Sequence, residues 1–493
     1  MEYQVKTTAL EKQKADCIVV GIFEGRELSE AATSIDTASK GVIKTWLKCG
    51  DLEGKIGQTS FLYQVPGVSA ERVLLVGCGK AKELTVDSYQ TIIGHVYAAT
   101  KLLPIKTLAC PLVTLDIKDR DIYWATRFAV ETFEHKHYHL HTYKSKPKKD
   151  LPELHEVTFM VSKAQSTQVT LGVKHATAIA HAVNTCRDLG NAPSNVCTPA
   201  YLADHAKALA KKHPKVTAKI LDETDMEKLG MRALLAVGKG SRHPSKLIVL
   251  HYQGAAKKSE APIVLVGKGV TFDTGGVNIK GPEGMLGMKM DMCGAASVLA
   301  TMQAVAELDL PINVSMIAPS VENMPDGNAY KPSDIITSYS GITIEVQNTD
   351  AEGRMILCDA LTYSLQFKPK AIIDVATLTG AMITSLGSEF SGLFGNHKPL
   401  INTLLEAGEQ SNDGAWHMPL NANYQKQIDS KIADIKNMGD KGAPGAIAAA
   451  CFLERFVEKN NWAHLDVAGT AMNTETTGRP VNLLVQYLLN QSK

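Results

Sequence analysis

The 493-residue sequence lacks any run of about 18 consecutive apolar residues, the shortest stretch that usually forms a transmembrane helix. Its first residues, MEYQVKTTALEKQKADCIVV, lack the apolar core of a signal peptide. The nine cysteines are scattered, and no two of them form a C-x-x-C pair. We therefore expect no membrane span and no disulfide framework, but reduced thiols in a cytoplasmic protein.

An excess of charge of either sign is also missing. The chain has 52 basic and 51 acidic residues, which gives a formal net charge of +1. This balance does not favour nucleic-acid binding by the whole molecule, although it leaves room for a local patch. The sequence contains no H-E-x-x-H, so a single zinc ion held by two histidines of one helix is not expected.

The chain is too long for one ordinary core, because a domain usually contains roughly 100–200 residues. In residues 1–160, apolar segments typical of buried strands alternate with a helical pattern at Val86–Leu103. The strand segments are Cys17–Phe23, Val73–Val76 and Thr107–Leu112. This alternation predicts an α/β domain built in layers.

A second α/β domain is predicted over residues 191–493, joined to the first by a helix within residues 161–190. The apolar spacing of Gln168–Leu189 indicates that helix. The strands predicted in the second domain are Leu247–His251, Pro262–Val266, Asn313–Ala318, Ala371–Ala376 and His464–Val467. The predicted helices are Ala295–Leu308, Met355–Gln366, Ile401–Gln410 and Ala446–Lys459. Helices between apolar strands favour a mostly parallel sheet covered on both faces.

Two motifs of the first domain have competing interpretations. GCGK, at Gly77–Lys80, follows a strand but lacks the third glycine of a dinucleotide fingerprint, so a strand-end turn is favoured over a nucleotide site. His135, His137, His139 and His141 alternate, and on a strand all four would face one side. With the lysines at 144, 146, 148 and 149 they suggest a metal or nucleic-acid patch, but a solvated edge strand is the favoured interpretation.

Three segments of the second domain combine glycines with charged residues. VGKGVTFDTGGVNIK contains Lys268 and Asp273, where the strand ending at Val266 should give way to a glycine-rich loop. MKMDMCGAA contains Asp291, and NTDAEGRM contains Asp350, Glu352 and Arg354. Each of these two segments lies just before a predicted helix. Ligands of open α/β sheets bind beyond the carboxyl ends of the strands, which is where these segments are expected.

Four carboxylates that converge without a cation would raise one another's pKa values. Two divalent cations would neutralise them, and a bridging pair of carboxylates suits ions roughly 3.5–4 Å apart, as in aminopeptidases, phosphatases and nucleases. Any one of these acids alone is more often a helix cap or a surface charge, and Asp350 and Glu352 could cap the helix that follows them. The combined pattern predicts a two-metal hydrolase and leaves a phosphoesterase open as an alternative.

NTDAEGR closely resembles the signature of the leucine aminopeptidase family, of the cytosol aminopeptidase type. The resemblance extends through VGKGVTFDTGG, NAPSNVCTP, ATLTGA, GAPGAIAAACFL and WAHLDVAGTA, and so covers the chain from about residue 190. The first domain resembles the family only in size and layout. The resemblance implies an N-terminal α/β domain of macro-domain type and a catalytic α/β/α domain of zinc-exopeptidase type.

The resemblance also implies the roles of individual residues. The metal ligands would be Lys268, Asp273, Asp291, Asp350 and Glu352, with Asp273 and Glu352 touching both ions. Lys268 and Asp291 would complete one site and Asp350 the other. A lysine ligand must be neutral, so the pKa of Lys268 would have to lie far below its usual value of about 10.4.

Two further residues are implied to be catalytic. Lys280 would stabilise the oxyanion of the tetrahedral intermediate, and Arg354 would bind a bicarbonate ion that acts as general base. The pocket for the first side chain of the substrate would be formed by Met288, Thr377, Gly380 and Ala468.

The function implied by the resemblance is a metal-dependent aminopeptidase that removes N-terminal amino acids, preferably leucine or other apolar residues, from short peptides. Its cofactors would be two Zn²⁺ or Mn²⁺ ions, with Mg²⁺ or Co²⁺ as alternatives, and bicarbonate. The resemblance further implies a cytoplasmic homohexamer that takes part in peptide turnover. A DNA-binding role is known for some family members, but here only the His/Lys stretch hints at it, and we expect no such partner.

Overall fold

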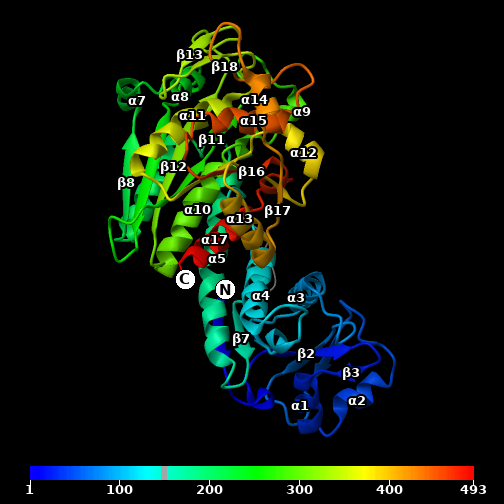
Figure 1. Cartoon of the computed structure of the whole chain (residues 1–493). Coiled ribbons are helices and arrows are strands. Elements are labelled where there is room, and N and C mark those ends of the chain that lie inside the picture. The colour runs from blue at the N-terminus through cyan, green and yellow to red at the C-terminus, as the bar shows by residue number, and fades with distance from the viewer. Residues whose placement is uncertain (141, 146–152, 493) are drawn as a thin grey trace. The chain divides into compact units, whose positions relative to one another are not determined.

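The computed structural model describes residues 1–140, 142–145 and 153–492. The chain forms two compact units, Met1–Ala180 and His181–Lys493. The division lies within α5 (Ser166–Asn191), which contains the predicted helix Gln168–Leu189, and we propose that this helix connects the domains. Figure 1 shows the first unit in blue to cyan and the second in green to red. Among the described residues, no helix combines the length and the apolar character needed to cross a membrane.

The first unit contains a mixed sheet in the order β1-β7-β6-β2-β5-β4, with β3 beside β2. The neighbours β1, β7, β6, β2 and β5 run parallel to one another. At the edges, β4 pairs antiparallel with β5, and β3 pairs antiparallel with β2. The elements of this unit are β1 (Glu2–Lys6), β2 (Cys17–Phe23), β3 (Glu27–Leu28), α1 (Glu30–Ala38), α2 (Val42–Leu47), β4 (Thr59–Tyr63), β5 (Arg72–Gly77), α3 (Val86–Thr100), β6 (Thr107–Cys110), α4 (Ile122–His137) and β7 (Glu156–Met160). The predicted α/β class, the three strands and the helix are confirmed.

Both faces of this sheet are buried, which explains the uninterrupted apolar segments in the sequence. Val19 and Leu74 belong to one buried cluster, and their neighbours Ile18 and Val73 belong to another. Because successive residues of a strand point to opposite faces, each face of the sheet therefore has its own core.

The predicted strand with four alternating histidines is wrong. His135 and His137 lie in the last turn of α4, which begins after the cap Asp121, whose carboxylate accepts a hydrogen bond from the Trp124 N–H. Apolar residues such as Ala129 and Phe133 recur at helical spacing and are buried, so the period of the preceding helix extends into the histidine stretch. His141 and the lysines at 146, 148 and 149 lie outside the described residues.

The glycines of GCGK serve the packing of a strand end. β5 ends at Gly77, and a Cβ atom there would lie 2.0 Å from the carbonyl oxygen of Lys55. Gly79 has a φ of +73°, which glycine adopts at little cost. The favoured interpretation as a strand-end turn agrees with this geometry.

The second unit contains a larger sheet in the order β17-β16-β19-β15-β10-β12-β9-β8, with β11 beside β12. The central neighbours β19, β15, β10 and β12 are parallel, whereas β16, β9 and β8 add antiparallel pairs. Its strands are β8 (Val216–Leu221), β9 (Lys246–Gln253), β10 (Ile263–Gly267), β11 (Gly269–Asp273), β12 (Asn313–Asn323), β15 (Ala371–Ala376), β16 (Ser391–Gly395), β17 (Ala415–His417) and β19 (Trp462–Asp466). A small sheet contains β13 (Ile335–Thr337), β14 (Thr343–Glu345) and β18 (Ile435–Lys436).

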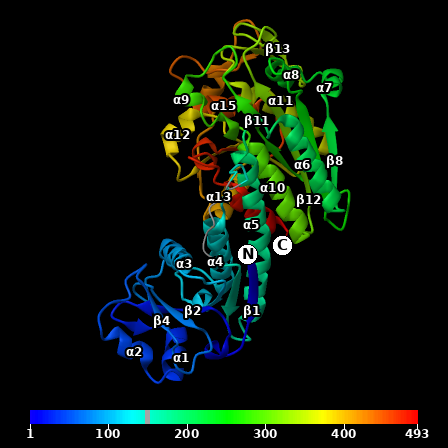
Figure 2. The ribbon, with the colours of Figure 1, turned by 180° about the vertical axis from the view of Figure 1, so that it is seen from behind.

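Helices cover both faces of the larger sheet (Figure 2). Val264 and Val266 of β10 pack in a buried cluster with residues of α8, α11 and α15, while Leu265, between them, points to the opposite face, and α10 also contacts β10. The helices are α6 (Pro199–Lys212), α7 (Glu223–Leu229), α8 (Arg232–Gly238), α9 (Pro282–Met285), α10 (Cys293–Leu308), α11 (Glu352–Ser364), α12 (Gly380–Leu386), α13 (Lys398–Ser411), α14 (Ala422–Gln425), α15 (Gly445–Glu454), α16 (Ala468–Ala471) and α17 (Val481–Gln491). The predicted strands and helices of this domain are all present, within a few residues at their ends.

The glycine-rich loop predicted after Val266 begins later than expected, because its first part is a strand. Gly269–Asp273 forms β11, which pairs in parallel with the end of β12. A Cβ atom at Gly269 would lie 2.6 Å from the carbonyl oxygen of Pro319, so glycine allows β11 to approach β12 closely. Asp273 is thereby placed at the end of a strand and not in an open loop.

Candidate metal centre

The predicted metal ligands come from three chain segments that meet at the carboxyl ends of neighbouring parallel strands. Lys268 lies between β10 and β11, and Asp273 ends β11. Asp291 precedes α10, while Asp350 and Glu352 lie at the start of α11. This is the edge of an open α/β sheet at which ligands bind.

Lys268 is in contact with two of the predicted carboxylates. Its Nζ lies 2.8 Å from Asp291 Oδ1 and 2.7 Å from Glu352 Oε1. It also donates a hydrogen bond to the carbonyl oxygen of Thr377, at 3.0 Å. All three charged side chains are almost completely buried.

Lys280 is in contact with the other two predicted carboxylates, those of Asp273 and Asp350. Its Nζ lies 2.8 Å from Asp273 Oδ2 and 2.5 Å from Asp350 Oδ1. Oxygen atoms of Asp273, Asp350 and Glu352 lie within 4.8 Å of one another, close enough to share a metal ion. The structure therefore brings together all five predicted ligands and Lys280.

Two oxygen atoms of this group suit a cation particularly well. Asp291 Oδ2 and Glu352 Oε2 are buried and have no hydrogen-bond partner. A buried carboxylate oxygen without a donor is unfavourable, and a divalent cation would satisfy it. The donor set consists of carboxylate oxygens and one lysine nitrogen, which fits hard divalent ions.

Burial raises the pKa of the Asp291 carboxyl group well above its usual range, and the charges of Glu352 and Asp273 add to this effect, although Lys268 opposes it. Burial likewise raises the pKa values of Asp273 and Asp350. Close carboxylates in a desolvated place hold protons more tightly, and bound cations would reverse this.

The pKa of Lys268 differs from what a neutral ligand requires. Burial by itself lowers it, but the nearby carboxylates of Asp291, Glu352 and Asp273 outweigh burial and raise it above the usual lysine value. With protein groups alone, Lys268 is therefore a charged partner of the acids. The lowered pKa expected for a lysine ligand would have to come from the cations themselves.

Asp350 and Glu352 do not cap α11, so the alternative interpretation as helix caps is wrong. The cap position is Ala351, and no side chain accepts a hydrogen bond there. The carboxylates are free to face the cluster.

Arg354 lies in the first turn of α11 and is buried. Its Nη1 donates a hydrogen bond to the carbonyl oxygen of Asn437, at 2.7 Å, while its Nε is buried without a partner. Burial lowers the pKa of this guanidinium to about 10. An anion beside Arg354 would therefore stabilise its charge.

The four predicted pocket residues have different environments. Thr377 follows β15 and is buried, and its hydroxyl donates to Asp291 Oδ1 at 2.8 Å, so it touches the cluster directly. Ala468, at the start of α16, is buried. Met288 is partly buried, and a Cβ atom added to the exposed Gly380 would meet nothing within 4 Å.

Two residues of the site were missed by the sequence analysis. Asn323, at the end of β12, donates its amide to Asp273 Oδ1 at 2.8 Å and so orients that carboxylate toward Lys280. Gly353 faces Lys268, whose Cε and Nζ would lie 2.6 and 2.8 Å from an added Cβ atom. Gly353 stands inside NTDAEGR and was visible as a glycine between charged residues, whereas nothing in the sequence singled out Asn323.

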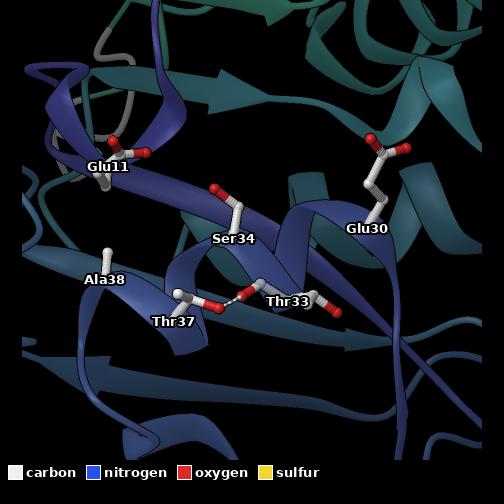
Figure 3. Close-up of a pocket in the computed structure, with 6 residues that line it drawn as sticks. All are labelled: Glu11, Glu30, Thr33, Ser34, Thr37 and Ala38. Carbon is white, nitrogen blue, oxygen red and sulfur yellow. Dashed lines mark hydrogen bonds between the residues drawn. The ribbon is translucent and has the colours of Figure 1, made fainter.

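A surface hollow in the first unit offers no comparable chemistry (Figure 3). The lining residues include serine and threonine hydroxyl groups, but no histidine, lysine or cysteine that could activate them. They are Glu11, Glu30, Thr33, Ser34, Thr37 and Ala38.

Comparison with known proteins decides among the chemistries that such a cluster allows. Residues 184–485 match the catalytic domain of the cytosol aminopeptidase family, and residues 19–147 match the N-terminal domain of the same family. The chain belongs to the cytosol aminopeptidase family. It is therefore an aminopeptidase of two α/β domains, and the family match favours a peptidase over the alternative of a phosphoesterase.

Relatives align with the whole chain. The cytosol aminopeptidase of Vibrio cholerae is 50% identical over 501 residues, which cover 100% of this chain and 99% of the relative. Probable cytosol aminopeptidases of Psychromonas ingrahamii and Colwellia psychrerythraea are 49% and 50% identical, with 100% of this chain covered in each case and 98% and 99% of the relatives. The first domain thus has the same family support as the second.

Proposed function

We propose that this aminopeptidase uses two divalent metal ions to remove N-terminal amino acids, preferably leucine or other apolar residues, from short peptides. The observation that supports it most strongly is the convergence of five potential ligands around two buried carboxylate oxygens that lack partners. The family match restricts this chemistry to peptide hydrolysis at the amino end.

In this proposal, Lys268, Asp273, Asp291, Asp350 and Glu352 hold the ions, Zn²⁺ or Mn²⁺ with Mg²⁺ or Co²⁺ as alternatives. When bound, the ions would polarise the scissile carbonyl group and acidify a water molecule, and a bicarbonate ion at Arg354 would supply a general base. The Asn323 amide and the Gly275 N–H both donate to Asp273 Oδ1, so this carboxylate is held in one orientation before any cation arrives.

Lys280 and Arg354 have separate roles. The ammonium of Lys280 would stabilise the negative charge that develops on the carbonyl oxygen of the scissile bond. The buried guanidinium of Arg354 would bind bicarbonate, and the support for this is its Nε atom without a partner and its position in the first turn of α11, where backbone N–H groups favour an anion.

The preference for an apolar first side chain is supported by the pocket residues. Ala468 and Met288 are apolar, and the open space beside Gly380 leaves room for a side chain. A free substrate amine held at the metal centre would confine cleavage to the amino end. We also propose a cytoplasmic homohexamer that functions in peptide turnover.

The test is digestion of a defined peptide library by the full-length protein loaded with each of Zn²⁺, Mn²⁺, Co²⁺ and Mg²⁺. Stepwise release of N-terminal leucine and methionine, dependent on the added ion, is the expected result. Internal cleavage, or equal release of all residues including charged ones, would contradict the proposal.

A further inference from the structure

Asp466, at the end of β19, lies beside the pocket but was not identified from the sequence. It is almost completely buried. Its Oδ1 accepts hydrogen bonds from the backbone N–H groups of Leu378 and Ala468, each at 3.2 Å. Its Oδ2 accepts a hydrogen bond from the Thr379 hydroxyl, at 2.7 Å. One carboxylate thus joins the connection between β15 and α12 to the first residue of α16.

Both segments that Asp466 joins carry predicted pocket residues. Thr377 and Gly380 flank Leu378 and Thr379, and Ala468 is itself a hydrogen-bond donor to Asp466. The helices that follow, α12 and α16, pack against each other. At their contact a Cβ atom on Gly469 would lie 2.0 Å from the carbonyl oxygen of Gly387. A shift of either segment would therefore move the other and change the shape of the pocket.

The same connection reaches the metal centre. The Thr377 hydroxyl donates to Asp291 Oδ1 and its carbonyl oxygen accepts from Lys268 Nζ. Asp466 consequently holds one end of a short segment whose other end touches two predicted ligands. Pocket and ligands are placed relative to each other through these few hydrogen bonds.

A carboxylate accepts hydrogen bonds from all three neighbours. An asparagine with its oxygen toward the two backbone N–H groups would present an NH₂ group to the Thr379 hydroxyl, which could then no longer donate to residue 466. Burial raises the pKa of the Asp466 carboxyl group, and the charge of His464 partly opposes this rise. The charge of Asp466 in turn raises the pKa of Arg354, which burial lowers. His464 is in turn held by Asp374, with 2.5 Å between Nδ1 and Oδ1.

We infer that Asp466 is a positioning residue that sets the preference for the first side chain by fixing Thr377, Gly380 and Ala468 relative to the metal centre. This inference rests on the proposed function. A displaced pocket wall loses contacts with leucine that alanine never makes, and such methylene contacts are worth roughly 10–200-fold in discrimination.

The test compares the full-length wild type with Asp466→Asn. We measure kcat/KM for leucine and alanine anilides, metal content by mass spectrometry, and binding of free leucine and free alanine by calorimetry. In Asp466→Asn the leucine-to-alanine ratio of kcat/KM should fall about tenfold, with weaker leucine binding, unchanged alanine binding and unchanged metal content. The matched control is Asp359→Asn, which replaces another fully buried carboxylate that accepts backbone N–H groups, and it should keep the wild-type ratio.

A second pair of variants serves if Asp466→Asn does not fold. Thr379→Val removes one donor to Asp466, whereas Thr379→Ser retains the hydroxyl, so only the valine variant should lower the ratio. An unchanged ratio in Asp466→Asn, or equal ratios in both Thr379 variants, overturns the inference. A wild type without a preference for leucine contradicts the proposed function as well, whereas a preference that survives in Asp466→Asn contradicts the inference alone.

Discussion

Lys268 Nζ lies 2.7 Å from Glu352 Oε1, and the backbone of Gly353 closes the space beside this ion pair. Lys268 also touches Asp291 and Thr377, so its ammonium group has little freedom to move. This contact joins the connection between β10 and β11 to the first residue of α11.

The first prediction concerns Gly353. In Gly353→Ala the added Cβ atom would lie 2.6 Å from Lys268 Cε, so the lysine must leave its contacts or α11 must shift. We expect at least tenfold lower kcat, and metal occupancy below that of the wild type, measured by mass spectrometry. Gly327→Ala is the control, because a Cβ atom there meets nothing within 4 Å. Wild-type activity and occupancy in Gly353→Ala would show that the site tolerates displacement of Lys268.

Removal of the metal ions is the second prediction. Chelator treatment should abolish hydrolysis of a leucine anilide, and added Mn²⁺ or Zn²⁺ should restore it, because in the proposed function the cations polarise the scissile carbonyl group and acidify the attacking water molecule. Residual metal is quantified beside the rate. Full activity of metal-free protein would eliminate the two-metal proposal.

The third prediction separates residues that bind metal from residues that use it. Asp350→Ala and Glu352→Ala remove proposed ligands, so metal content and activity should fall together. Lys280→Ala leaves all five ligands in place, and its kcat should fall roughly 100–1000-fold with little change in KM, as for loss of one oxyanion donor. In Arg354→Ala, kcat should fall less than in Lys280→Ala, and added bicarbonate should not raise the activity of this variant.

Metal analysis beside steady-state kinetics of each variant decides this point. Near-normal kcat in Lys280→Ala would refute its oxyanion role. Loss of metal in that variant would show that the contacts of Lys280 with Asp273 and Asp350 are needed to assemble the site.

A blocked amino terminus provides the fourth prediction. A short peptide beginning with leucine should be cleaved, and its N-acetylated form should not, because the acetyl group removes the amine that would coordinate a metal ion. Chromatography of the digests measures both rates under identical conditions. Comparable rates would rule out the amine as a ligand.

The fifth prediction concerns pH and stability. Burial raises the pKa of Asp359 to about 6, although N–H groups of Tyr339 and Leu234 lower it in part. Because the folded-state pKa lies above the unfolded value, the carboxyl group contributes stability below the unfolded pKa and loses it as pH rises to about 6. The free energy of unfolding of the wild type, relative to Asp359→Asn, should therefore fall by about 2 kcal/mol between pH 4 and pH 7.

Denaturant unfolding at several pH values measures this difference in the free energy of unfolding. The hydrogen bond that the asparagine variant loses adds a contribution that does not change with pH. A pH-independent difference would mean that Asp359 has the same pKa in the folded and unfolded chains.

Much of this protein was accessible from the sequence because its signals are local. The apolar segments of β2, β5, β10 and β15 are continuous since both faces of each sheet are covered, and the glycines around Lys268 and Glu352 mark tight approaches of the backbone. Local spacing also singled out the four acids and Lys268, as NTDAEGR and VGKGVTFD each bring two of them into one short segment.

Other features depend on partners that are distant in the chain. Spacing could not show that Gly269–Asp273 is a strand, because β11 exists only where the end of β12 lies beside it. The alternating histidines suggested a strand, but the helix that begins at Ile122 continues to His137 because its buried face packs in the core. Asn323 and Asp466 act through hydrogen bonds to residues of other segments, and such pairing is decided only when the tertiary structure brings the donors and acceptors together.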